Sequence, residues 1–175
     1  QLITSAGKAD YYVWSSKPTL SDGLSSIWLV PSDSQGLEIP TKYDGLGLRA
    51  NSSAPILAND VLISDCNLLG KDGDGFNVMM ETVMPFFSLQ NCAVSVGSME
   101  GALRRAVEHV TSSRYSYDES ALCDIPQVRS HIAKMRLKID LVAGFLLDAL
   151  DAIELQREDA MLRVLQAKLA GAETS

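Results

Sequence analysis

The stretch IPQVRSHIAKMRLKIDLVAGFLLDALDAI, residues 125–153, decides the fold. Its apolar residues recur at steps of three and four, which places them on one face of an α-helix. They are Ile125, Val128, Ile132, Met135, Ile139, Val142, Leu146, Leu150 and Ile153. The pattern predicts one helix of about eight turns, with Asp124 as its cap and Pro126 in its first turn.

Other helical stretches flank this one on both sides. Residues 76–84 predict a short apolar helix that Pro85 should end or kink, because proline lacks an amide donor and crowds the preceding turn. A longer helix follows to about Ser113, and a third begins near Arg157 and is still strongly helix-forming at residue 175. Long helices joined by short loops favour an antiparallel bundle.

The first 70 residues have a different pattern, in which short β-prone runs alternate with Gly, Pro, Asn and Ser. The strands are expected at 2–4, 11–15, 26–30, 37–39, 55–57 and 61–63. Their spacing predicts an antiparallel sheet or barrel. The chain is therefore an α+β protein, with residues 1–72 in a β domain and residues 73–175 in a helical domain.

Composition excludes several kinds of protein. A net charge of −7 and a pI near 4.7 argue against nucleic-acid binding, which needs clustered Lys and Arg. No apolar run is long enough to span a bilayer, which predicts a cytoplasmic protein without a membrane span. The three cysteines lack metal-site spacing, and His109 and His131 lie far apart, so no metal site is expected. The chain begins and ends inside expected elements, as a piece of a longer protein does.

Several local patterns resemble the acyl-CoA dehydrogenase family, and they occur in the family's order. The family patterns are W-I-T-N-G-x-x-A-D/N, K-x-G-x-R-x-S, F-x-D-V-x-V-P…N-L-L-G…G-x-G-F and A-x-x-Y-x-x-x-R. The matching segments are LITSAGKAD at 2–10, YDGLGLRANS at 43–52, NDVLI at 59–63, NLLG at 67–70, GDGF at 73–76, and Arg114 after AVEHV at 106–110. No single segment is specific, so the order carries the resemblance.

The resemblance implies a fold and an activity. In the family a β-barrel-like domain packs between two helical domains, and this chain would cover part of the β domain and the first helices of the C-terminal one. FAD binds at subunit contacts of a homodimer or homotetramer. The flavin takes a hydride from an acyl-CoA thioester while a glutamate removes the α-proton, and an electron-transferring flavoprotein is an expected acceptor.

The resemblance also implies which residues meet FAD. Thr4 matches a threonine beside the reactive edge of the flavin, and Leu2 stands where the family usually has tryptophan. Arg114 matches an arginine on the FAD pyrophosphate, a role that suits its planar fork of donors. The full set of cofactor-binding candidates is Leu2, Ile3, Thr4, Ser5, Arg114, Ser116, Tyr117 and Gln127.

On the substrate side the chain departs from the family pattern. Ser88 falls where an arginine usually lies near the thioester, and Phe87 falls where some subfamilies have the catalytic glutamate. Both are substrate-binding candidates, and no matched general base, hence no catalytic residue, is visible. Met79, Met80, Met84, Phe86 and Phe87 form an apolar cluster that suits either an acyl pocket or a core.

Two other functions stay open at this stage. One is a flavin-dependent monooxygenase, or a related sulfur- or nitrogen-oxidising enzyme, on the same fold. The other is a non-catalytic oligomeric scaffold derived from it, because an apolar stripe such as that of residues 125–153 also suits a helical oligomer core. Flavin binding separates the enzymes from the scaffold.

Overall fold

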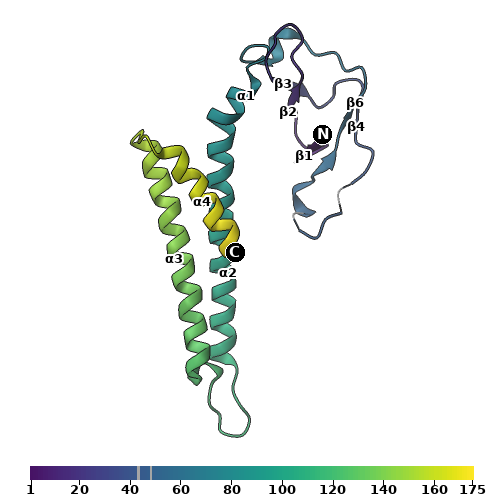
Figure 1. The fold of residues 1–175 in the computed structure, drawn as a ribbon. Helices are drawn as coiled ribbons and strands as arrows, with labels where there is room; N and C mark the ends of the chain where they lie inside the picture. The colour runs from purple at the N-terminus through teal and green to yellow at the C-terminus, as the bar shows by residue number, and fades with distance from the viewer. Residues whose placement is uncertain (43, 48) are drawn as a thin grey trace. The chain divides into compact units, whose positions relative to one another are not determined.

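A computed structural model describes residues 1–42, 44–47 and 49–175 and divides the chain into two compact units. The first unit is Gln1–Met80 and the second is Glu81–Ser175. The first contains short strands and the second contains long helices (Figure 1), so the predicted α+β class is confirmed. The sequence prediction placed the boundary earlier, between residues 72 and 73.

The first unit is built from three small antiparallel sheets rather than a closed barrel, as far as the described residues show. The strands are β1 (Leu2–Ile3), β2 (Tyr11–Ser16), β3 (Ser26–Pro31), β4 (Leu37–Glu38), β5 (Ala54–Pro55), β6 (Leu57–Ala58) and β7 (Leu68–Leu69). They pair as β1 with β5, as β2-β3-β7, and as β4 with β6.

The β2–β3 hairpin is the main sheet contact of this unit. Tyr12 pairs with Val30 and Trp14 with Trp28 across the two strands. Tyr12 and Val30 are buried in a small core with Ala6, Ala54 and Ile56. Both strands coincide with the β-prone runs at 11–15 and 26–30, so these two strand predictions are confirmed.

Two strand predictions need correction. The run at 55–57 is divided between β5 and β6, which pair with different strands. Residues 61–63 lie outside the strands, and β7 pairs with β3 at Ile27 and Trp28. A β-prone run becomes a strand only where a neighbour offers a free edge, and here β7 occupies that edge of β3.

The chain remains helical from Gly75 to Ser112. It forms α1 (Gly75–Val78), a π-helical turn (Met79–Val83) and α2 (Met84–Ser112). The helix therefore does not end at Pro85, the second residue of α2. The wider π turn lies just before the proline and includes Glu81, whose carbonyl the proline ring would otherwise crowd.

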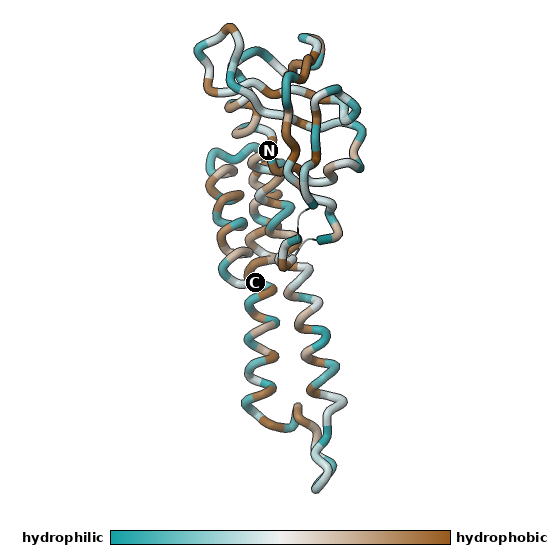
Figure 2. Tube along the Cα trace, turned by 90° about the vertical axis from the view of Figure 1, so that its right-hand side faces the viewer, coloured by the Kyte–Doolittle hydropathy of each residue, from teal (hydrophilic) through white to brown (hydrophobic). Residues whose placement is uncertain are grey.

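The second unit packs α2, α3 (Pro126–Glu154) and α4 (Ala160–Thr174) side by side, with α4 against both longer helices (Figure 1). Apolar and polar positions alternate along all three helices (Figure 2). Ile139 and Val142 lie at the centre of the core, as the sequence pattern predicted. None of the helices in the described part of the chain combines the length and apolarity of a membrane span.

The turn between α3 and α4 is held by charged side chains and by the backbone. Arg157 donates two hydrogen bonds to Asp159 and one to Asp148, and Arg163 also pairs with both carboxylates. Gln156 has a φ of 50°, and its amide donates to Ile153 O, while that of Arg157 donates to Ala152 O. These two bonds are the Schellman ending of a helix.

Candidate functional site

The segment expected beside the flavin ends strand β1 in a tight turn. Ser5 has a φ of 59°, in the left-handed region that asparagine and glycine adopt most readily. The family pattern has asparagine at this position. The amides of Ser5 and Ala6 donate to the carbonyls of Asn51 and Ser52, so the turn is fixed by a second segment of the chain.

This turn leaves two candidate side chains accessible. Thr4 is exposed, and its Oγ1 lies 3.4 Å from Ser53 Oγ, a long contact that leaves the hydroxyl available as a donor. Leu2 is 66% exposed and offers an apolar surface, whereas Ile3 is half-buried and packs against the small core. Thr4 and Leu2 thus lie at one accessible strand end.

The segment at 43–52 also carries part of the resemblance. Tyr43 and Leu48 lie outside the described residues. Of the rest, Asn51 has a clear structural role, because its Oδ1 accepts from Ser53 N at 3.0 Å and its carbonyl accepts from Ser5 N. The end of this segment supports the turn that follows Thr4.

Arg114 begins a structured loop between α2 and α3. It pairs with Ala121 in an antiparallel bridge, and its Nη1 donates to Glu119 O at 3.0 Å. The arginine is exposed, so the remaining guanidinium donors face outward. The loop thus fixes the backbone of Arg114 and one guanidinium nitrogen, and it leaves the rest of the guanidinium accessible.

The other polar residues of this loop have different surroundings. Ser116 and Tyr117 are exposed, and the Tyr117 ring lies 5.5 Å from that of Tyr115. Asp118 accepts from both the amide and the hydroxyl of Ser120, at 3.1 and 2.8 Å. Its carboxylate therefore stabilises the turn between Asp118 and Ser120.

Gln127 lies in the first turn of α3 and is exposed. The predicted cap of this helix is wrong, since the residue before Pro126 is Ile125 and it makes no capping bond. Asp124 instead accepts from Ala121 N at 2.8 Å and closes the short 3₁₀ turn Leu122–Asp124. The carboxylate therefore stabilises the 3₁₀ turn and does not cap α3.

The two substrate-side candidates, Phe87 and Ser88, are adjacent on α2 but differ in burial. Phe87 is 55% exposed, and Lys168 Nζ of α4 lies 5.3 Å from its ring centroid. Ser88 is 0% exposed, and its Oγ has no hydrogen-bond partner among the described residues. The sequence did not single out Lys168, because only the packing of α4 on α2 brings it to Phe87.

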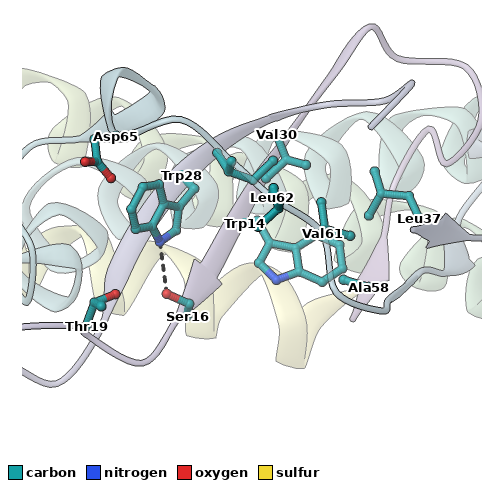
Figure 3. A pocket seen from close by; sticks show the side chains of 11 residues that line it. Trp14, Ser16, Thr19, Trp28, Val30, Leu37, Ala58, Val61, Leu62 and Asp65 are labelled. Carbon is teal, nitrogen blue, oxygen red and sulfur yellow. Dashed lines mark hydrogen bonds between the residues drawn. The ribbon is translucent and has the colours of Figure 1, made fainter. Parts of the chain in front are cut away.

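Each unit also has a cavity, and of the apolar cluster that the sequence offered for an acyl pocket, Phe86 alone lines one of the two. In the first unit a pocket of about 370 Å³ lies beside Trp14 and Trp28, and Trp28 Nε1 donates to Ser16 Oγ at 2.9 Å (Figure 3). In the second unit an apolar groove of about 630 Å³ lies between the ends of the three helices, at Phe86, Leu150 and Met161. Both volumes lie in the usual range of ligand pockets.

The accessible residues fit FAD in their chemistry. A neutral hydroxyl donor beside an apolar surface, as at Thr4 and Leu2, suits the edge and face of a flavin ring. An exposed guanidinium on a fixed loop, as at Arg114, suits a pyrophosphate. The assignments of individual residues to FAD stay predictions.

The comparisons with known proteins agree with the sequence patterns. A profile described as "Acyl-CoA dehydrogenase, C-terminal domain" matches residues 73–175. The probable acyl-CoA dehydrogenase YngJ of Bacillus subtilis is 29% identical over 124 residues, which make up 71% of this chain and 32% of YngJ.

Two solved structures have the same fold. Butyryl-CoA dehydrogenase from Megasphaera elsdenii matches with a TM-score of 0.88 and 22% identity, over 99% of this chain and 45% of that one. An FAD-dependent dehydrogenase matches with a TM-score of 0.87 and 23% identity, over 99% and 46%.

This chain therefore spans less than half the length of the proteins it matches, and FAD is the cofactor of the family that they represent. The profile match covers more than half of the chain. The chain belongs to the acyl-CoA dehydrogenase family.

Proposed function

We propose that this chain is part of an FAD-dependent enzyme that introduces an α,β double bond into an acyl-CoA thioester. The observation that carries the proposal is the end of β1, where the Ser5 turn leaves Thr4 and Leu2 accessible in a segment that matches the family's flavin pattern. When bound, FAD would accept the hydride from the β-carbon of the substrate.

The chain's own residues would hold and orient the cofactor. The Thr4 hydroxyl would donate a hydrogen bond to the ring edge, where negative charge builds up on reduction. Leu2 would pack on the ring face, with less shielding than the tryptophan of the family pattern, and Ile3 and Ser5 would fix the strand end.

The phosphate end of FAD would be held by the α2–α3 loop and the start of α3. The outward donors of Arg114 suit paired bonds to phosphate oxygens. Ser116 and Tyr117 would add hydroxyl donors from the same loop, and Gln127 would add an amide from the first turn of α3.

Phe87 and Ser88 would belong to the substrate side. Phe87 is the accessible one of the two and offers an apolar ring to an acyl chain. Ser88 lies in the interior, so its role would be to set the position of the neighbouring ring. Neither side chain is a general base, and the proposal assigns proton abstraction to no residue of this chain.

The partners of the whole protein are also proposals. We expect a homodimer or homotetramer, an acyl-CoA or a similar thioester as the substrate, and an electron-transferring flavoprotein as the acceptor. The cytoplasmic location inferred from the sequence stays a prediction.

The decisive experiment is a visible absorption spectrum of the purified full-length protein, repeated after addition of a medium-chain acyl-CoA. Loss of the longer-wavelength flavin band is expected, because hydride transfer reduces the bound flavin. A flavin spectrum that does not bleach would move the assignment to the oxygenases of this fold or to another substrate.

Variants test the assignment of the site. Thr4→Val and Arg114→Ala should each lower flavin occupancy, since each removes a donor to the cofactor. Thr41→Val and Arg105→Ala are matched controls at exposed positions and should keep it. Full occupancy in both site variants would overturn the roles of Thr4 and Arg114.

A scaffold remains the second candidate because of the exposed leucines on α3 and α4. Leu137, Leu141, Leu162 and Leu169 are each more than half exposed, which suits contact with another protein surface. A stable oligomer that takes up no flavin, even when refolded with FAD, would favour the scaffold over the enzyme.

A further inference from the structure

The carboxylate of Asp72 binds three successive backbone amides of a distant loop. Leu20 N donates to its Oδ2 at 2.7 Å and Ser21 N at 3.1 Å. Thr19 N lies 3.1 and 3.2 Å from the two carboxylate oxygens. Consecutive N–H groups that converge on one point form an anion-binding nest.

Ser26 adds a fourth donor to the Asp72 carboxylate. Its side chain is fully buried, its hydroxyl donates to Asp72 Oδ1, and its oxygen accepts from Gly73 N at 2.8 Å. The hydroxyl is thus held in one orientation, toward the carboxylate. A buried donor with one accepted bond and one donated bond has little freedom to point elsewhere.

The loop and the segment that contains Asp72 approach closely. A Cβ on Gly23 would lie 2.2 Å from Gly73 O, and one on Gly73 would lie 2.0 Å from Ser21 Oγ. The two backbones therefore fit only because both positions are glycine. This fit holds Gly23 against Gly73 independently of the Asp72 side chain and so keeps the end of the loop near Ser26.

The loop gains little from apolar burial. Leu20 is 94% exposed and Leu24 is 74% exposed, so neither anchors the loop in a core. The hydrogen bonds to Asp72 are the contacts that order residues 19–21. Without them the three amides would open to water.

Asp72 is held by neutral donors, because it forms no salt bridge with any Lys or Arg among the described residues. The bonds from Ser26, Leu20, Thr19 and Ser21 still lower the pKa of Asp72 to about 2. The donors therefore stabilise a negative charge through their own dipoles.

We propose that residues 19–21 and Ser26 form a built anion-binding site that the chain's own Asp72 occupies, and that a small free carboxylate binds there when this side chain is removed. In the wild-type protein, Asp72 in this site holds residues 19–21 in place. The proposal concerns the first unit only and does not rest on flavin binding or on the proposed enzymatic activity.

The test is chemical rescue by formate in an Asp72→Ala variant of the full-length protein. Hydrogen exchange of the peptide that covers residues 18–26 reports directly on the three amides. Wild type should show slow exchange with or without formate. The variant should exchange faster in sodium chloride and recover its protection, saturably, in sodium formate of equal ionic strength.

Controls separate a specific site from a general salt effect. Asp22→Ala removes an exposed carboxylate of the same loop and should keep wild-type protection. Asp72→Ala combined with Ser26→Ala should lose the response to formate, because the buried hydroxyl donor is gone.

Each outcome decides the proposal. If Asp72→Ala does not fold in chloride, recovery of folded protein during refolding in formate becomes the readout, and equal yields in both salts would overturn the proposal. If Asp72→Ala does fold in chloride, the proposal is overturned when formate leaves the exchange rate of residues 18–26 unchanged. It is also overturned when formate slows the exchange of this peptide equally in wild type.

Discussion

Gly171 on α4 lies directly against Cys92 on α2, and a Cβ built on Gly171 would stand 3.3 Å from both the Cα and the Sγ of Cys92. Cys92 is almost fully buried at this contact, and its burial raises the pKa of the thiol. The glycine sets the distance between two of the three helices.

Gly171→Val should therefore destabilise the protein by about 1–3 kcal/mol, the usual effect of overpacking against a fixed backbone. Gly101→Val on α2 is the matched control, because a Cβ at Gly101 meets open space, and its effect should stay within about 0.5 kcal/mol. The measurement is the free energy of unfolding in urea. Equal effects of the two changes would contradict the contact.

Gln156→Gly should stabilise the protein by roughly 0.5–1 kcal/mol, because Gln156 holds the left-handed position that ends α3. Glycine adopts this conformation without the steric cost of a Cβ. Gln156→Ala keeps the Cβ and should show no gain. The thermal midpoints of the three proteins give the comparison, and a gain in both variants would point to the glutamine side chain instead.

Acid should weaken the contribution of Asp72 to stability. The bond from Ser26, followed by the backbone bonds from residues 19–21, lowers its pKa from 3.8 to about 2 in the folded protein. The unfolded chain therefore takes up the proton first as the pH falls. The contribution is complete above about pH 4 and is lost as the pH falls toward 2.

Asp72→Asn should thus be less stable than wild type at pH 7, and the difference should shrink between about pH 4 and pH 2. Asp22→Asn is the control, with a small difference from wild type throughout. Denaturant unfolding at several pH values measures this. A difference that stays constant down to pH 2 would show that Asp72 acts other than through its charge.

Ser88→Ala should raise the free energy of unfolding by about 1 kcal/mol, because it removes a buried hydroxyl that lacks a partner. Its KM for an acyl thioester should stay close to that of wild type, while Phe87→Ala at the exposed neighbouring position should raise KM. A large KM effect of Ser88→Ala with unchanged stability would place Ser88 in contact with substrate.

The sequence pattern predicted the helical core well where the apolar stripe is central. Ile139 and Val142 are buried as expected, but Leu150 and Ile153 are exposed and the alanines beside them, Ala149 and Ala152, are fully buried. A spacing of three and four residues is compatible with either pair, the alanines or Leu150 and Ile153, on the buried face of α3. The close packing of α4 selects the small residues, and one helix in isolation does not contain that information.

The strands and the site show a similar limit. The β-prone runs identified β2 and β3, whereas residues 61–63 lie outside the strands and β7 pairs with the other edge of β3. Thr4 and Arg114 were singled out by resemblance alone, and no local pattern predicts the cation over Phe87. Contacts between distant segments decide these features.

The π-helical turn Met79–Val83 contains one more residue than the α-helical turn it replaces. A single deletion here would convert it to a regular turn, whereas a deletion elsewhere in α2 would rotate every later side chain by about 100°. The regular turn would, however, bring the ring of Pro85 against the carbonyl four residues before it. Natural or engineered shortening between residues 79 and 83 should therefore occur together with replacement of Pro85.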